Sequence, residues 1–229
     1  MKLVRQKVGL LTAVLAVTSV FAGNAALAAD GLYVSGQIGS SKLGHTIERN
    51  TGGLALPVPD TSGTTFVEET EAEIGVAIGY LFSSSNGKFY YGPEAYVNYE
   101  TAETRNINGV LIGDVELNYS YGARLLGGVN ITNEFSVYTH IGVKVVDFDL
   151  GHSYTFAPPV RTESDSEVGF SYGVGAAYDV RDDVALFVDY TIANDIDFGG
   201  IPEVAGGTNR VDPNEIDLNT LSFGLKYSF

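Results

Sequence analysis

Eight charged or titratable residues fall inside regularly alternating stretches of the sequence and are the first candidates for chemistry. They are Glu73, Glu94, Glu116, Arg124, His140, Lys144, Asp189 and Lys226. In each stretch one face is apolar, and these residues fall on the other face, among glycine, serine and tyrosine. Such a set can do acid–base chemistry, line an ion path or form a buried ion-pair network. The secondary-structure elements that carry these residues decide which of these three roles is possible.

Eight stretches alternate with a period of two, the side-chain period of a β-strand. They begin near Leu32, Ala72, Phe89, Val115, Phe135, Val168, Val184 and Leu221. No Lys, Arg, Asp or Glu falls on the apolar face of any stretch. A soluble sandwich also alternates, but its polar face is usually rich in charge. The pattern therefore indicates strands whose apolar face meets lipid, and a sheet in lipid must close because its backbone groups find no other partners.

The connections between these stretches alternate strictly between short and long. The short ones are residues 83–88, 130–134 and 181–183. The long ones cover residues 41–71, 100–114, 147–166 and 193–218. This order predicts an all-β fold, a transmembrane eight-stranded antiparallel up-and-down β-barrel, with both chain ends on the side of the short turns.

The first 28 or 29 residues predict a cleaved signal peptide. Three basic residues precede an apolar run from Val8 to Ala22, and Ala26-Leu27-Ala28 matches an A-x-A cleavage site. The run is shorter than the roughly 20 residues of a membrane-spanning helix. Residues 29–229 then form one domain without cysteine, with 10 basic and 28 acidic residues and a net charge of −18. That charge disfavours a nucleic-acid partner.

The final stretch, LSFGLKYSF, alternates up to its last aromatic residue. Its apolar positions are Leu221, Phe223, Leu225, Tyr227 and Phe229. From GLYVSGQIG at residues 31–39 to this end, the chain resembles the eight-stranded outer-membrane barrels of Gram-negative bacteria, the OmpA/OmpX and opacity-protein group. The resemblance implies that the last strand is the signal read by the outer-membrane assembly machinery, and it implies periplasmic chaperones as partners. The peptidoglycan-binding domain of OmpA is not expected, because the sequence stops at Phe229.

Depth above the short turns predicts how the charged residues are arranged in the lumen. A lower layer is expected to hold Glu94, Arg124, His140, Asp189 and Lys226. Glu73, Glu116 and Lys144 are expected above it. An eight-stranded barrel is just wide enough for side chains, so we expect this network to plug the lumen. A small passive pore for ions or small solutes is the alternative.

An enzyme is not expected, and neither is a cofactor. Some eight-stranded barrels of this membrane modify lipid A with a serine, a histidine and an acid. The expected neighbour of His140 is the cation Arg124, which opposes protonation of the imidazole. His152 directly precedes Ser153, and adjacent side chains usually point apart. The remaining histidine, His45, completes no lipid-facing set of serine, histidine and acid.

The long connections are acidic. Residues 43–71, 100–116, 147–167 and 195–217 hold 20 of the 28 acids. The weak candidates for a calcium or magnesium site are Asp147, Asp149, Asp195 and Asp197. Their spacing fails the EF-hand pattern, so a solvated negative surface is the preferred interpretation. A weak divalent bridge to lipopolysaccharide phosphates stays open.

Two stretches of these connections are apolar, LALPVP at 54–59 and YTFAPPV at 154–160. Their candidate contact residues are Leu54, Leu56, Val58, Tyr154, Phe156 and Val160. They are expected to pack on each other over the barrel mouth or to contact an extracellular partner. The sequence thus predicts a non-enzymatic structural or surface-interaction protein of the outer membrane, with lipid and lipopolysaccharide around it and four long acidic loops outside.

Overall fold

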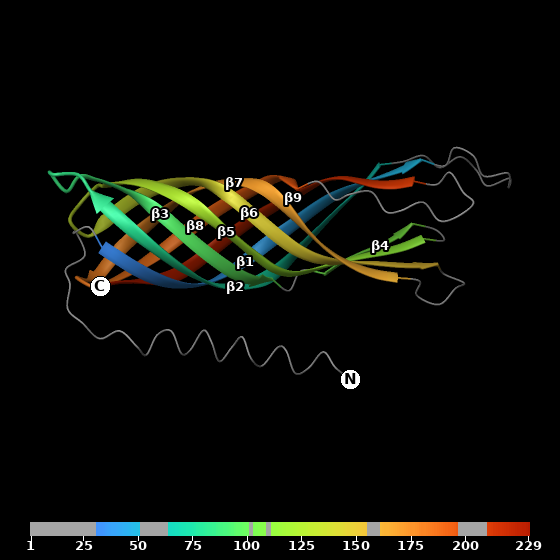
Figure 1. Ribbon diagram of the computed structural model, residues 1–229, viewed down its shortest axis with the longest axis horizontal. Coiled ribbons are helices and arrows are strands. Elements are labelled where there is room, and N and C mark those ends of the chain that lie inside the picture. The colour runs from blue at the N-terminus through green and yellow to red at the C-terminus, as the bar shows by residue number, and fades with distance from the viewer. Residues whose placement is uncertain (1–30, 51–63, 101–102, 109–110, 155–160, 197–209) are drawn as a thin grey trace, which may run out of the picture.

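The computed structural model is a closed antiparallel barrel and describes residues 31–50, 64–100, 103–108, 111–154, 161–196 and 210–229. Its strands are β1 (Gly31–Asn50), β2 (Thr64–Ser83), β3 (Phe89–Glu100), β4 (Glu103–Asn108), β5 (Leu111–Asn130), β6 (Phe135–Tyr154), β7 (Arg161–Arg181), β8 (Val184–Ile196) and β9 (Arg210–Ser228). β3 and β4 follow one another along the same neighbour, β5, so they make one pass and the barrel has eight. Pairing of β1 with β9 and of β3 with β5 closes the ring (Figure 1). The predicted fold is confirmed.

The short turns lie at one end of the barrel, together with the C-terminus (Figure 1). In the turn between β2 and β3, Gly87 has a φ of 65°, a left-handed conformation that favours glycine. The Ser84 hydroxyl donates to Asn86 Oδ1 at 2.7 Å and accepts from the backbone N–H of Phe89 at 3.0 Å. No helix that could cross a bilayer occurs in the described residues, and the predicted signal peptide lies outside them.

The strands continue far beyond the alternating stretches, so the predicted boundaries of the long connections were wrong. β1, β2, β5 and β6 each have 20 residues. A tilted strand needs only about 9–11 residues to cross a bilayer. Beyond the lipid neither face of a strand must be apolar, so the alternation fades although backbone pairing continues.

A β-bulge changes which residues of β5 face the lumen. The register between β5 and β6 shifts between Leu117 and Tyr119, so Asn118 is the extra residue. Leu117, predicted to face lipid, is only 2% exposed, whereas Glu116, predicted in the lumen, is exposed. Both predictions were wrong for this reason, because a one-residue shift exchanges the two faces of a strand.

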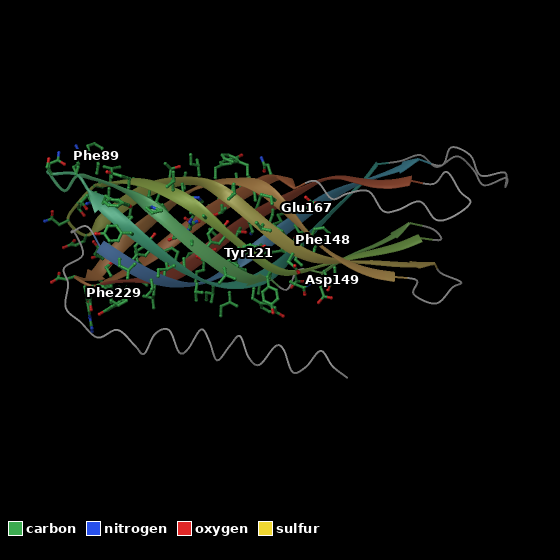
Figure 2. The ribbon with its side chains drawn as sticks, viewed as in Figure 1. Phe89, Tyr121, Phe148, Asp149, Glu167 and Phe229 are labelled. Carbon is green, nitrogen blue, oxygen red and sulfur yellow. The ribbon has the colours of Figure 1, made fainter. Side chains whose placement is uncertain are left out.

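The outer face of the barrel is apolar and exposed, as lipid contact requires. Phe89 and Tyr121 show this face in Figure 2. Ile38, Leu125 and Val174 are 65%, 60% and 60% exposed. Near the turns, the ring centroids of Phe82 and Tyr91 stack 5.5 Å apart.

Inside the barrel, five aromatic residues each face a glycine directly opposite on the neighbouring strand. The pairs are Tyr33 with Gly79, Tyr90 with Gly128, Tyr96 with Gly122, Tyr138 with Gly175 and Phe187 with Gly224. A Cβ atom at any of these glycines would overlap the facing ring. The glycines therefore give the rings room to lie against the wall and fill the lumen.

Gly175→Ala is expected to destabilise the barrel by about 1–3 kcal/mol, because the added methyl group overlaps the buried ring of Tyr138. Gly127→Ala is the matched control, since a Cβ there meets no atom within 4 Å. Urea titration in lipid vesicles, followed by far-UV circular dichroism, measures the difference. Equal stabilities of the two variants would contradict the packing argument.

Candidate functional site

Arg124 of β5 is the centre of the lower charge layer. Its Nε donates to Glu94 Oε1 of β3 at 2.5 Å, and its Nη1 donates to Asp189 Oδ1 of β8 at 3.2 Å. Arg124 and Glu94 face each other directly across the β3–β5 ladder. The side chains of Arg124, Glu94 and Asp189 are 9%, 2% and 3% exposed. One cation thus joins two buried carboxylates from different strands.

Surrounding side chains hold both carboxylates in place. The Tyr33 hydroxyl donates to Glu94 Oε2 at 2.7 Å, and the Thr191 hydroxyl donates to Asp189 Oδ1 at 2.7 Å. Arg124 lies over the Tyr96 ring, with its guanidinium carbon 5.5 Å from the ring centroid. These contacts lower the cost of burying the charges, although Asp189 Oδ2 has no hydrogen-bond partner in the described residues.

His140 of β6 completes the layer through one ring nitrogen. Its Nε2 lies 3.2 Å from Arg124 Nη1 and 3.2 Å from Asp189 Oδ1. When Arg124 donates to Nε2, the neutral imidazole carries its proton on Nδ1, which has no hydrogen-bond partner in the described residues. The imidazole is 1% exposed, so it is positioned as part of the buried network.

Lys226 of β9 lies among aromatic rings. Its Nζ is 4.7 Å from the ring centroid of Tyr33 and 5.7 Å from that of Tyr138. Within the described part of the chain, no carboxylate lies within ion-pair distance of this ammonium group. Cation–π contacts with the two rings therefore stabilise a buried cation that we expected to balance an acid directly.

A second charged layer lies on the outer side of the first. Lys144 Nζ of β6 is 2.8 Å from Glu100 Oε1 of β3, and the Ser120 hydroxyl donates to the same oxygen at 2.5 Å. Glu100 was missed, because it was counted with an outer connection. Its even spacing from Glu94 along β3 already placed it on the lumen face.

Glu73 of β2 takes part in this second layer through hydrogen bonds. It accepts from Gln37 Nε2 at 3.0 Å, from the Ser222 hydroxyl at 2.9 Å and from the Ser41 hydroxyl at 3.1 Å. The carboxylate is 3% exposed. Its hydrogen bonds tie β2 to β1 and β9.

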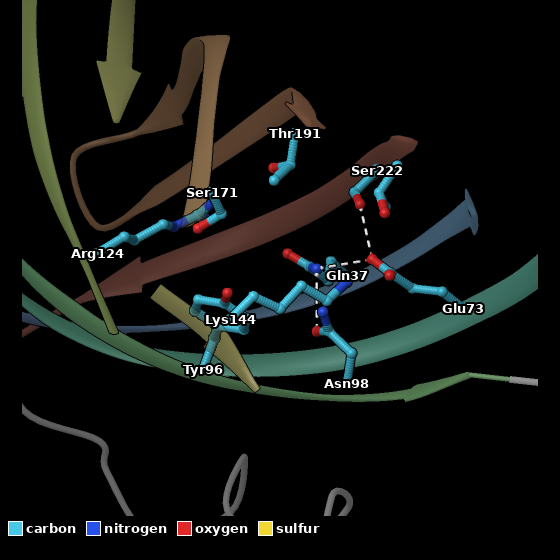
Figure 3. Close-up of a pocket in the computed structure, with 10 residues that line it drawn as sticks. Gln37, Glu73, Tyr96, Asn98, Arg124, Lys144, Ser171, Thr191 and Ser222 are labelled. Carbon is cyan, nitrogen blue, oxygen red and sulfur yellow. Dashed lines mark hydrogen bonds between the residues drawn. The ribbon is translucent and has the colours of Figure 1, made fainter. Parts of the chain in front are cut away.

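A polar cavity of about 20 Å³ lies between the layers (Figure 3). It is lined by Gln37, Glu73, Tyr96, Asn98, Arg124, Lys144, Ser171, Thr191, Thr220 and Ser222. The Ser171 hydroxyl is buried there and makes no hydrogen bond within the described chain. This volume suits one water molecule and is too small for an organic solute.

An apolar cluster fills the lumen on the outer side of both layers. It consists of Leu43, Leu117, Val146, Phe148, Ala193 and Leu218, which are 0–2% exposed. Leu43, Phe148, Ala193 and Leu218 lie in segments that we had counted as outer loops. Leu117 had been predicted to face lipid, and Val146 had been assigned to neither face. Apolar side chains offer an ion nothing to replace its hydration.

The other predicted residues lie at the outer end. Asp149 accepts a hydrogen bond from Asn118 Nδ2 at 3.0 Å (Figure 2 shows its position beside Phe148). The described residues contain no group of three or more His, Cys, Asp or Glu side chains arranged to hold a metal ion. The remaining metal candidate Asp197 and the apolar loop residues Leu54, Leu56, Val58, Phe156 and Val160 lie outside the described residues. For four further residues only the backbone is described. They are His45 in β1, His152 and Tyr154 in β6, and Asp195 in β8.

The terminal strand pairs on both sides. Leu221, Phe223 and Leu225 are exposed on the lipid face, and the rings of Tyr227 and Phe229 meet edge to face at 5.0 Å. The backbone N–H of Phe229 donates to the carbonyl of Leu32 at 3.0 Å. The predicted assembly signal is thus also the strand that closes the barrel between β1 and β8.

The family model of the outer membrane protein beta-barrel domain matches residues 12–229. The chain belongs to this family. Among solved structures, OprG from Pseudomonas aeruginosa is 13% identical, with a TM-score of 0.52, over 89% of this chain and 99% of that one. Ail from Yersinia pestis is 15% identical over 87% and 99% of the two chains, with a TM-score of 0.44, and AlkL is 19% identical over 91% and 95%, with a TM-score of 0.43. A search of curated protein sequences finds no match.

Arg124→Met is expected to destabilise the barrel by about 3–5 kcal/mol, because it leaves two buried carboxylates without their cation. Adding Glu94→Gln should recover part of this loss, since one uncompensated charge is then removed. The sequence contains no tryptophan, so urea unfolding is followed by circular dichroism. Lys88→Met, at an exposed turn, is the control and should change stability by less than about 0.5 kcal/mol. A loss in Arg124→Met no larger than in this control would refute the central role of Arg124.

Proposed function

We propose that the protein is a non-enzymatic outer-membrane barrel with a closed lumen, which acts through its outer end as a structural or surface-interaction protein. The observation that carries the proposal is the succession of three barriers in the lumen. The Arg124 layer, the Lys144 layer and the apolar cluster around Phe148 follow one another along the axis. A solute would have to displace all three to pass.

The environment of His140 supports a non-enzymatic role. Its Nε2 lies 3.2 Å from both Arg124 Nη1 and Asp189 Oδ1, so either tautomer makes a hydrogen bond within the network, and the ring is buried inside the barrel. A lipid substrate would approach from the opposite face of that wall. A histidine so placed is poorly suited to activate a nucleophile at the lipid interface.

The acidic outer segments support a role at the cell surface. They carry most of the net charge of −18 that we expect for residues 29–229, at the end away from the short turns. The exposed apolar belt is suited to lipid and lipopolysaccharide as its surroundings. With the lumen closed, the outer strands and loops are the part of the molecule available to an extracellular partner.

A small passive pore is the second candidate. The polar cavity between the two charged layers favours it, because buried water and exchangeable ion pairs can form part of a path. The pore requires the apolar cluster to open as well. For this reason the closed barrel ranks first.

In planar bilayers, the refolded protein is expected to show no discrete current steps, and Arg124→Ala is expected to stay silent because two barriers remain. Lys88→Ala, outside the lumen, is the matched control, and a heat-dependent shift in gel mobility verifies that each sample is folded. A general porin added afterwards shows that the bilayer reports openings. Steady openings of the native protein that change in Arg124→Ala but not in Lys88→Ala would replace the closed barrel with the pore.

A further inference from the structure

The barrel wall divides into two arms at its outer end. β2 pairs with β3 from the turn outward to the pair Glu73 and Glu100. Beyond this pair, the described residues of β2 pair with β1 alone, and β4 pairs with β5 alone. Figure 1 shows the result: β2, β1 and β9 run into one arm, and β4, β5, β6 and β7 run into the other.

The wall is divided a second time between β7 and β8. Their outermost pair is Phe170 with Asn194, although β7 extends outward to Arg161. From Arg161 to Gly169, the described part of β7 pairs with β6 alone. In the described residues, each arm is therefore a small sheet with two edge strands, β2 and β9 in the first arm and β4 and β7 in the second.

An edge strand leaves alternate backbone N–H and C=O groups for another strand to bind. Natural proteins protect such edges with proline, bulges, covering segments or charged side chains, most often lysine. The outer part of β2, Thr64–Thr70, reads TTFVEET and contains neither lysine nor proline. Its register with β1 is unbroken from Thr64 inward. It combines five residues of high β-propensity with two acids, so its backbone can accept a strand while its charge selects among strands.

We propose that the outer edge of β2, Thr64–Thr70, binds an extended cationic peptide segment, which adds to the first arm as a further β-strand. This inference rests on the proposed surface-interaction function and specifies its partner. Backbone hydrogen bonds supply the pairing, and Glu68 and Glu69 supply the charge that a basic peptide complements. Across the gap, β4 begins with another acid, Glu103.

Charge also argues against a second copy of the chain on this edge. Two β2 edges side by side would bring the acidic pairs Glu68 and Glu69 of both copies together, and like charges on neighbouring strands are destabilising. The β7 edge, Arg161–Gly169, contains three acids, but Arg161 at its outer end opposes a basic peptide there, whereas Thr64–Thr70 contains no basic residue. The cationic peptide therefore fits the β2 edge better than either alternative.

The test measures binding of a fluorescent nine-residue peptide of alternating lysine and valine to the full protein in nanodiscs. The same peptide methylated on alternate backbone nitrogens keeps its charge but loses the N–H groups that donate to β2. It should bind at least about tenfold more weakly, because each net hydrogen bond contributes about 1 kcal/mol. A glutamate analogue should not bind. Hydrogen exchange at Thr64–Thr70 should slow when the lysine peptide is added.

Two double variants of the protein test whether the peptide binds at the β2 edge or at the β7 edge. Glu68→Gln with Glu69→Gln should weaken binding by about three- to tenfold, because the basic peptide loses two opposite charges to pair with. Glu163→Gln with Asp165→Asn removes the same charge from the β7 edge and is the matched control, with a change of less than about twofold. The proposal is overturned if the methylated peptide binds equally well, if both double variants weaken binding alike, or if exchange at Thr64–Thr70 is unchanged.

These outcomes are separable from those of the closed-lumen proposal. A silent bilayer together with failed peptide binding removes only the β2 edge proposal. A conducting native protein removes the closed lumen, whatever the peptide does.

Discussion

Pairing of every backbone group within the lipid is the constraint on which this structure depends. Lipid offers no hydrogen-bond partners, so the sheet has to close, and β9 does so by pairing with β1 on one side and β8 on the other. A barrel of eight membrane-crossing strands has a lumen that is only as wide as the side chains that fill it. The facing aromatic and glycine residues follow from this width, since a ring can lie against the wall only where the opposite residue has no side chain.

The narrow lumen also explains why its charges form a connected network. Breaking a buried ion pair is strongly unfavourable, although a well-packed apolar replacement can be as stable. The network therefore contributes specificity as well as stability. A one-residue slip of β5 would turn Arg124 toward lipid and leave Glu94 and Asp189 without their cation. Such a register is penalised far more than a slip in an all-apolar lumen.

The parts of the structure that lipid governs were predictable from the sequence, and the parts beyond it were not. The alternation around Glu94, Arg124, His140 and Asp189 identified both strand and face, because lipid demands an apolar outside. Where lipid ends, β1 continues without that signal, and its outer part was read as a loop. The bulge at Asn118 leaves no composition signal, so Glu116 and Leu117 were assigned to the wrong faces. The pairing of Lys144 with Glu100 depends on cross-strand register, which one sequence does not contain.

The same constraint accounts for the divided outer end. Inside the bilayer an unpaired edge would leave backbone groups without partners, whereas outside it water can satisfy them. Closure is therefore obligatory up to the pair Glu73 and Glu100 and optional beyond it, and the wall separates into two arms where it becomes optional. The two charged layers fill the lumen at and below this level, and the apolar cluster fills it just beyond. In the described residues, the wall is therefore continuous where lipid surrounds it and ends in strand edges beyond the lipid.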